Sequence, residues 1–80
     1  MSENELSHLI KMANQIASNI GIGSTEEDCI KKVVTHITAF WALPMRQKIC
    51  ANMEEFAEDL NPIATKALLV IQVDIKAKHA

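Results

Sequence analysis

Apolar residues recur every three to four positions in four stretches of the chain, which is the spacing of one face of an α-helix. The apolar arc of the first stretch consists of Leu6, Leu9, Ile10, Ala13, Ile16, Ala17 and Ile20. That of the second consists of Cys29, Ile30, Val33, Val34, Ile37, Phe40 and Trp41. The arc of the third stretch consists of Met45, Ile49, Cys50, Met53, Phe56, Ala57 and Leu60. That of the fourth consists of Ile63, Ala64, Ala67, Leu68, Ile71 and Ile75. The pattern predicts helices over residues 3–20, 25–41, 44–59 and 62–76.

Signals for helix starts agree with these ranges. Ser24-Thr25 precedes three acidic residues, and both the Ser24–Glu27 and the Thr25–Asp28 spacings are those of a capping box. Pro44 suits the first turn of the third helix, because a proline there loses no helical hydrogen bond. Asn61-Pro62 combines a capping side chain with a proline at the first helical position. The gaps between the helices are short, which favours neighbouring helices that run antiparallel.

Residues 70–75 allow a second interpretation, because Val-Ile-Gln-Val-Asp-Ile alternates between apolar and polar positions and is rich in β-branched residues. A lone strand in a helical chain has nothing to pair with. We therefore expect a helix that frays from about Asp74. The sequence predicts an all-α single domain over residues 1–80, a small four-helix bundle whose last helix is either packed outside the bundle or used for association.

Composition narrows the class of protein. The chain has 80 residues, of which 49% are hydrophobic and 22% charged, with two glycines, two prolines and a net charge of −2. This is too apolar for a disordered protein, too poor in turn residues for a β-sandwich, and not basic enough to coat nucleic acid. The acidic start does not resemble a signal peptide, and the longest apolar run, residues 67–71, is far too short to span a membrane. We expect a cytoplasmic protein.

The sequence offers little for catalysis, cofactor binding or metal binding. Cys29 and Cys50 lie on apolar arcs and are expected to be buried, reduced thiols. Together with His36 they would give a metal only three ligands, with no closely spaced pair, so we expect no metal site. The acidic residues of 54–59 are expected to form the solvated outer face of the third helix. No catalytic triad and no glycine-rich phosphate loop is present, and a thiol reductase that uses the two cysteines is a distant third interpretation.

Two features exceed what a small core requires. Phe40 and Trp41 are adjacent, so they point about 100° apart on a helix and cannot face the core equally well; we expect Phe40 in the core and Trp41 available to a partner. Arg46 follows Met45 in the first turn of a helix, where the helix dipole disfavours a cation, and it falls inside the apolar arc. An arginine in that place requires a carboxylate or carbonyl partner, either internal or on another protein.

The second feature is surplus apolar surface. Leu69 and Val73 fall outside the apolar arc of the fourth helix, and Met12 borders the arc of the first. Tryptophan, arginine and methionine are also enriched at the centres of protein interfaces. These residues therefore favour a protein partner.

Several segments carry a resemblance to a known family. Residues 10–17 read I-K-M-A-N-Q-I-A, Phe40-Trp41 is followed by Met45-Arg46, and residues 60–63 read L-N-P-I ahead of Ala67-Leu68. Together they resemble the delta subunit of NAD-dependent, molybdenum- or tungsten-containing formate dehydrogenases. The resemblance runs from about Leu9 to Leu68, and the M-A-N-Q-I block is its specific part. The family usually has Asp-Pro directly after Phe-Trp, whereas here Ala42-Leu43-Pro44 intervenes.

The resemblance implies a small, noncatalytic, cofactor-free subunit that assists assembly, maturation or stability of a complex whose alpha subunit carries the metal. The expected partner is that catalytic alpha subunit, and neither nucleic acid nor a membrane is expected. The expected partner-binding residues are Met12, Asn14, Gln15, Trp41, Met45, Arg46, Leu69 and Val73. The alternative is a free-standing helical regulator or a homodimer that pairs through its fourth helix.

Overall fold

The computed structural model describes the backbone of residues 2–20 and 25–79, and the side chains of 5–20 and 25–77. Four helices are present in these ranges: α1 (Ser2–Asn19), α2 (Glu26–Phe40), α3 (Leu43–Ala51) and α4 (Pro62–His79). No strand occurs in the described ranges, so the predicted all-α four-helix fold is confirmed. The β-branched residues 70–75 are helical, and α4 continues to His79 instead of fraying from Asp74.

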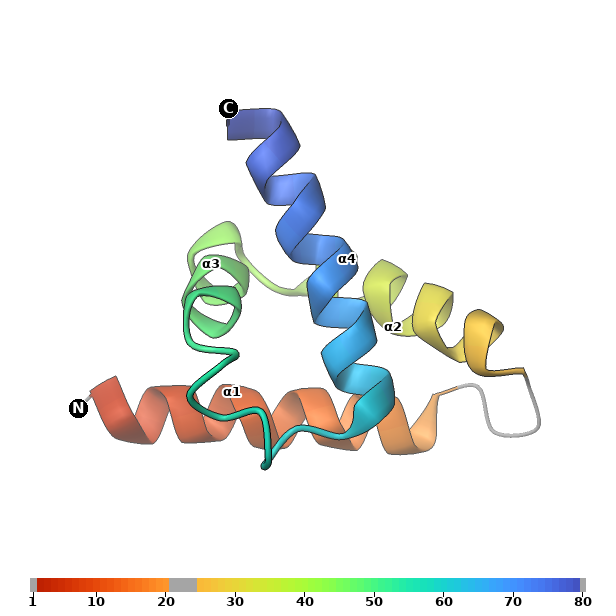
Figure 1. Ribbon diagram of the computed structural model, residues 1–80, viewed down its shortest axis with the longest axis horizontal. Coiled ribbons are helices and arrows are strands. Elements are labelled where there is room, and N and C mark those ends of the chain that lie inside the picture. Colours follow the sequence, from red (N-terminus) through yellow and green to blue (C-terminus); the bar gives the residue numbers. More distant parts are fainter. Residues whose placement is uncertain (1, 21–24, 80) are drawn as a thin grey trace.

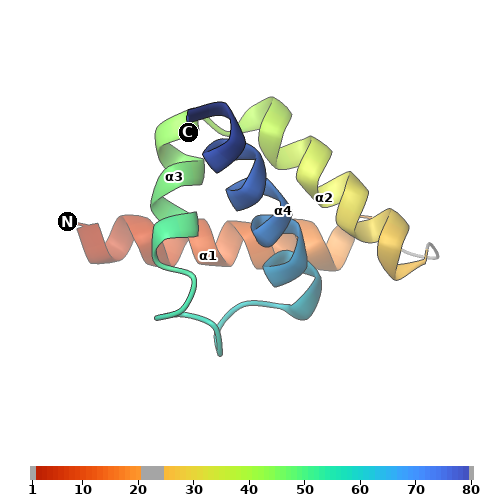
Figure 2. The same ribbon diagram turned by 45° about the horizontal axis from the view of Figure 1, so that its top comes forward.

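The helices pack as a crossed arrangement with α4 at its centre. Figure 1 shows α1 along one side of the molecule, with α4 rising steeply from it between α3 and α2. The turned view in Figure 2 keeps α4 between α3 and α2, and both α3 and α2 contact α1. α4 contacts all three of the other helices. This arrangement gives the molecule extents of 36 × 28 × 21 Å.

The core lies where α4 meets the other helices. Ala64, Ala67 and Leu68 of α4 are completely buried, and Ile71 is nearly so. Two alanines on one face bring the backbone of α4 close to its neighbours, since they add little side-chain bulk between helices. The interpretation in which the last helix packs outside the bundle is therefore wrong. Only the outer face of α4, with Leu69, Val70 and Val73, stays exposed.

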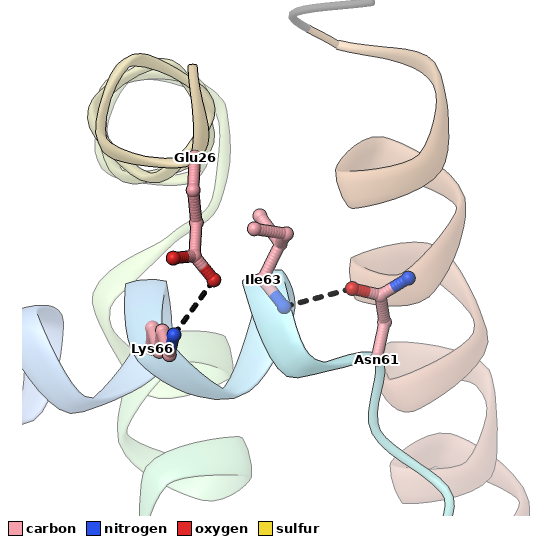
Figure 3. Close-up of polar contacts among 4 residues, drawn as sticks. All are labelled: Glu26, Asn61, Ile63 and Lys66. Atoms are coloured by element: carbon pink, nitrogen blue, oxygen red, sulfur yellow. Dashed lines mark hydrogen bonds and ion pairs between the residues drawn. The ribbon is translucent and has the colours of Figure 1, made fainter.

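Capping side chains fix where α2 and α4 begin. Thr25 Oγ1 accepts a hydrogen bond from the amide of Asp28 at 3.2 Å, as the Thr25–Asp28 spacing predicted, whereas the Ser24–Glu27 pairing involves a residue outside the described range. Asn61 Oδ1 accepts one from the amide of Ile63 at 2.8 Å (Figure 3). These bonds satisfy amides that have no partner inside the helix. Figure 3 also shows Lys66 Nζ 2.6 Å from Glu26 Oε1, an ion pair that joins α4 to the start of α2.

The third helix is shorter than predicted, since it ends at Ala51 and residues 52–59 form successive turns. This segment carries four acidic residues, with Glu54 four positions before Glu58 and Glu55 four before Asp59. A helix there would pair like charges and place them at its negative C-terminal end, both of which destabilise it. Asn52 Nδ2 instead donates to the carbonyl of Lys48 at 2.8 Å, which caps α3.

Candidate protein-docking surface

An apolar groove runs between α1, α2 and the beginning of α3. Its volume is about 610 Å³. Residues four apart on α1 and on α2 face it, because positions at that spacing share one side of a helix. The groove, called here the α1–α2 groove, is lined by Met12, Gln15, Ile16, Asn19, Ile20, His36, Phe40, Trp41 and Met45.

Phe40 is the most prominent apolar side chain beside the groove. It is 75% exposed, whereas Trp41 is 5% exposed, which reverses the prediction that Phe40 lies in the core. α2 ends at Phe40, and the backbone of Trp41 is extended (φ −94°, ψ 135°). The indole therefore does not continue the helical arc but turns into the core. Pro44 gives a reason for this end, because a helix continued through it would lack the bond from the residue-44 amide to the carbonyl of Phe40 and would clash with that carbonyl.

His36 lies beside Phe40 on α2. Their ring centroids are 4.8 Å apart and the ring planes are tilted by 43°. Such a tilted pair contributes about 0.5–1.5 kcal/mol, so it favours this orientation of the Phe40 ring. An exposed aromatic ring is suited to insertion into a partner's pocket.

A second hollow lies on the other side of Phe40. Its volume is about 440 Å³ and it shares Ile20, His36 and Phe40 with the α1–α2 groove; the rest of its lining is Lys31, Lys32, Thr35 and Ala39. Phe40 therefore forms a ridge between two hollows that belong to one surface. We call this surface, the α1–α2 groove together with the second hollow, the Phe40 face.

Four of the residues predicted to bind a partner line the α1–α2 groove: Met12, Gln15, Trp41 and Met45. Leu69 and Val73 lie apart from it on the outer face of α4, where Val73 is 67% exposed. Sequence reasoning missed the exposure of Phe40. The available signal was Pro44, because a helix cannot continue through it without losing the bond to the carbonyl of Phe40.

Asn14 forms hydrogen bonds within the chain. Its Nδ2 donates to the carbonyl of Asp59 at 2.7 Å, and its Oδ1 accepts from the amide of Asn61 at 2.6 Å. Both bonds tie α1 to the segment that leads into α4. The residues of the M-A-N-Q-I block therefore have different roles. Met12, Gln15 and Ile16 line the groove, Ala13 is fully buried, and Asn14 supports the fold.

Arg46 is placed as the sequence predicted, in the first turn of α3 and partly buried. Its Nε is buried and has no hydrogen-bond partner, and no ion pair joins its guanidinium to a described carboxylate. The start of α3 adds no negative charge, because Ala42 provides no side-chain cap and the first turn has no acidic residue. A buried donor without an acceptor lowers the stability of the folded chain. Arg46 therefore requires a partner that the described residues do not provide.

The two cysteines differ in burial. Cys50 is buried and its Sγ lies 3.6 Å from the carbonyl oxygen of Leu68, whereas Cys29 is half-buried, so the prediction that both are buried is correct only for Cys50. Burial raises the pKa of the Cys50 thiol from 9.0 to about 11, and the positive charge of Arg46 opposes this rise. Cys50 is therefore a protonated, poorly nucleophilic thiol at neutral pH.

The sequence also raised the questions of a metal site, a membrane span and an acidic face. Within the described residues no three His, Cys, Asp or Glu side chains are grouped closely enough to hold a metal ion. None of the helices, over their described residues, is both long and apolar enough to cross a membrane. The carboxylates of Glu54, Glu55, Glu58 and Asp59 are exposed, as predicted, although they lie on turns.

A family model of the NADH-dependent formate dehydrogenase delta subunit (FdsD) matches residues 8–68. Searches of curated proteins and of solved structures found no protein similar to this chain. The matched segment contains every residue that lines the Phe40 face, while Leu69 and Val73 lie outside it. Because the match covers most of the sequence, the chain belongs to the family of NADH-dependent formate dehydrogenase delta subunits.

Proposed function

We propose that this chain is a noncatalytic accessory subunit that binds the catalytic alpha subunit of a formate dehydrogenase in the cytoplasm. Through this binding it assists the assembly, maturation or stability of the complex. Membership of a family named for a subunit supports a role inside a complex. The observation that carries the proposal is the Phe40 face, an apolar groove with an exposed aromatic ring.

The physical argument starts from the cost of exposing apolar surface. A monomer of this size gains most of its stability by burying such surface, and an aromatic ring left in water beside an apolar groove forgoes that gain. Interfaces place aromatic anchors at their centre, and amphipathic helices commonly bind in grooves between helices. The Phe40 face has both features, so we assign the alpha subunit to it.

Co-purification tests the binding. Tagged alpha subunit is expressed with the wild-type chain, with Phe40→Ser or with Val73→Ser, and the amount of bound chain is measured. Both side chains are largely exposed, so neither substitution opens a cavity in the core. We expect Phe40→Ser to lower the bound amount about tenfold or more, as for a central aromatic anchor, and Val73→Ser to leave it unchanged. Equal binding by Phe40→Ser and the wild type would exclude this face.

The assisting role has a separate test. The catalytic subunits are produced with and without this chain, and formate-dependent NADH formation and metal content are measured per alpha subunit. We expect both quantities to fall when the chain is absent, and Phe40→Ser to reproduce that fall. Full activity and full metal content without the chain would contradict the assisting role.

A further inference from the structure

We infer that the segment of the alpha subunit recognised by this chain combines an apolar stripe, which contacts Phe40, with a carboxylate that pairs with Arg46. The inference rests on the proposed function and specifies the chemistry of the partner. It is carried by the buried Nε of Arg46, which has no hydrogen-bond partner, together with the apolar lining of the α1–α2 groove, to which the preceding residue Met45 belongs.

The first step is the position of the charge. Arg46 itself lines neither hollow, but it directly follows Met45, which lines the α1–α2 groove, and both belong to the first turn of α3. The Nε of Arg46 is buried without an acceptor, and the described chain gives the guanidinium no carboxylate within ion-pair distance. The buried Nε is out of a partner's reach, but the residue is only partly buried, so an incoming carboxylate would pair with the terminal guanidinium nitrogens. Such charge-assisted hydrogen bonds are the strong ones.

The second step is the absence of competing negative charge on the Phe40 face. No Asp or Glu is among the described residues that line the α1–α2 groove or the second hollow. The charged residues of the second hollow are Lys31 and Lys32. Lys31 pairs with Glu27 at 3.9 Å, but these side chains are 71% and 82% exposed, so the pair is weak and easily exchanged.

The third step is where the acidic residues of the chain lie. Glu54, Glu55, Glu58 and Asp59 belong to the segment between α3 and α4, which Figures 1 and 2 both show away from α2. The chain as a whole carries a net charge of −2, yet it leaves Arg46 uncompensated. An acidic partner segment would meet attraction at Arg46 and repulsion at the 54–59 segment, which selects one orientation of binding.

Calorimetric titration of purified alpha subunit with this chain tests the inference. The variants are Arg46→Gln, which removes the charge, and Arg46→Lys, which keeps it. Lys76→Gln, at an exposed cation of α4, controls for the change in net charge. We expect Arg46→Gln to raise the dissociation constant about tenfold or more, Arg46→Lys to restore part of the affinity, and Lys76→Gln to change little. Raising the salt concentration should weaken the wild type more than Arg46→Gln.

The possible failures are distinguishable. If the wild type binds and Arg46→Gln binds equally well with the same salt dependence, the carboxylate is wrong while the proposed function stands. If the wild type does not bind the alpha subunit at all, the proposed function fails and this inference with it. Should Arg46→Gln melt at a lower temperature, Arg46→Met, which keeps the apolar stem, replaces it. If Arg46 instead mediates contact with a second copy of this chain, sedimentation of the isolated protein shows an Arg46-dependent dimer, and the inference is overturned.

Discussion

At the scale of single residues, Arg46 shows a conflict between folding and binding. Its Nε is buried without an acceptor, which costs stability in the isolated chain. Replacement by methionine keeps a long unbranched stem and removes the unsatisfied donor. We expect Arg46→Met to raise the free energy of unfolding by about 1 kcal/mol, measured by thermal or urea denaturation. A lower free energy of unfolding would mean that Arg46 supports the fold through contacts within the chain.

Cys50 gives a pH dependence with a definite sign. Its pKa is raised from 9.0 to about 11 in the folded chain, first by burial and against the opposing charge of Arg46. Below pH 9 the thiol is protonated in both states and the full stability is present. Between about pH 9 and about pH 11 the unfolded chain loses its proton first, so the free energy of unfolding falls as pH rises.

The measurement compares the wild type with Cys50→Ala over this pH range. We expect the wild-type free energy of unfolding to decline more steeply than that of Cys50→Ala, because all other groups are common to the two proteins and their contributions cancel in the difference. In alkylation at pH 8, we expect the half-buried Cys29 to react before the buried Cys50. Parallel curves, or faster alkylation at Cys50, would contradict the burial of this thiol.

At the scale of helices, the sequence predicted which elements exist better than where they end. Periodicity found all four helices, because the buried side of each is set by side-chain spacing alone. The end of α3 was misplaced, although Met53 and Leu60 are buried as their spacing indicated. Met53 and Leu60 are buried although the segment consists of turns, so apolar spacing alone could not distinguish a helix from a segment of turns. The like charges at residues 54 to 59 were the signal that favoured turns.

Asn14 illustrates how an element depends on a residue that the sequence placed at the interface. Its side chain forms hydrogen bonds with the carbonyl of Asp59 and the amide of Asn61, just before α4 begins. We expect Asn14→Ala to lower the free energy of unfolding by about 1–3 kcal/mol, since both backbone groups lose their partner. Hydrogen exchange at residues 59–61 should also become faster. Normal stability with weakened binding of the alpha subunit would instead make Asn14 a contact residue.

At the scale of the whole molecule, the fold class and part of the candidate surface followed from the sequence. Met12, Gln15 and Met45 were identified as partner-binding candidates and line one groove, because helical spacing places them on adjoining faces. The exchange of roles between Phe40 and Trp41 did not follow, since it depends on how the chain turns after α2. The central place of α4 also required the packing of all four helices, which no single helical pattern contains.

The whole molecule presents a second apolar surface, the outer face of α4 with Leu69, Val70 and Val73. It lies beyond the segment that matches the delta-subunit family, so it is the place to test the homodimer alternative. Residues at positions i, i+1 and i+4 form a narrow strip, which suits a symmetric pairing of two α4 helices better than a deep groove does. Burial of such a strip is small in area, so self-association should be weak.

We therefore expect the isolated chain to sediment as a monomer at low concentration and increasingly as a dimer at high concentration. Val73→Ser should shift this equilibrium toward the monomer, because it removes the most exposed apolar side chain of the strip, while Phe40→Ser should leave it unchanged. The two variants thus have opposite effects in the two assays, since Phe40→Ser impairs binding of the alpha subunit and Val73→Ser does not. A chain that stays monomeric at every concentration would exclude the homodimer alternative. A dimer that is weakened by Phe40→Ser would mean that self-association and alpha-subunit binding compete for one face.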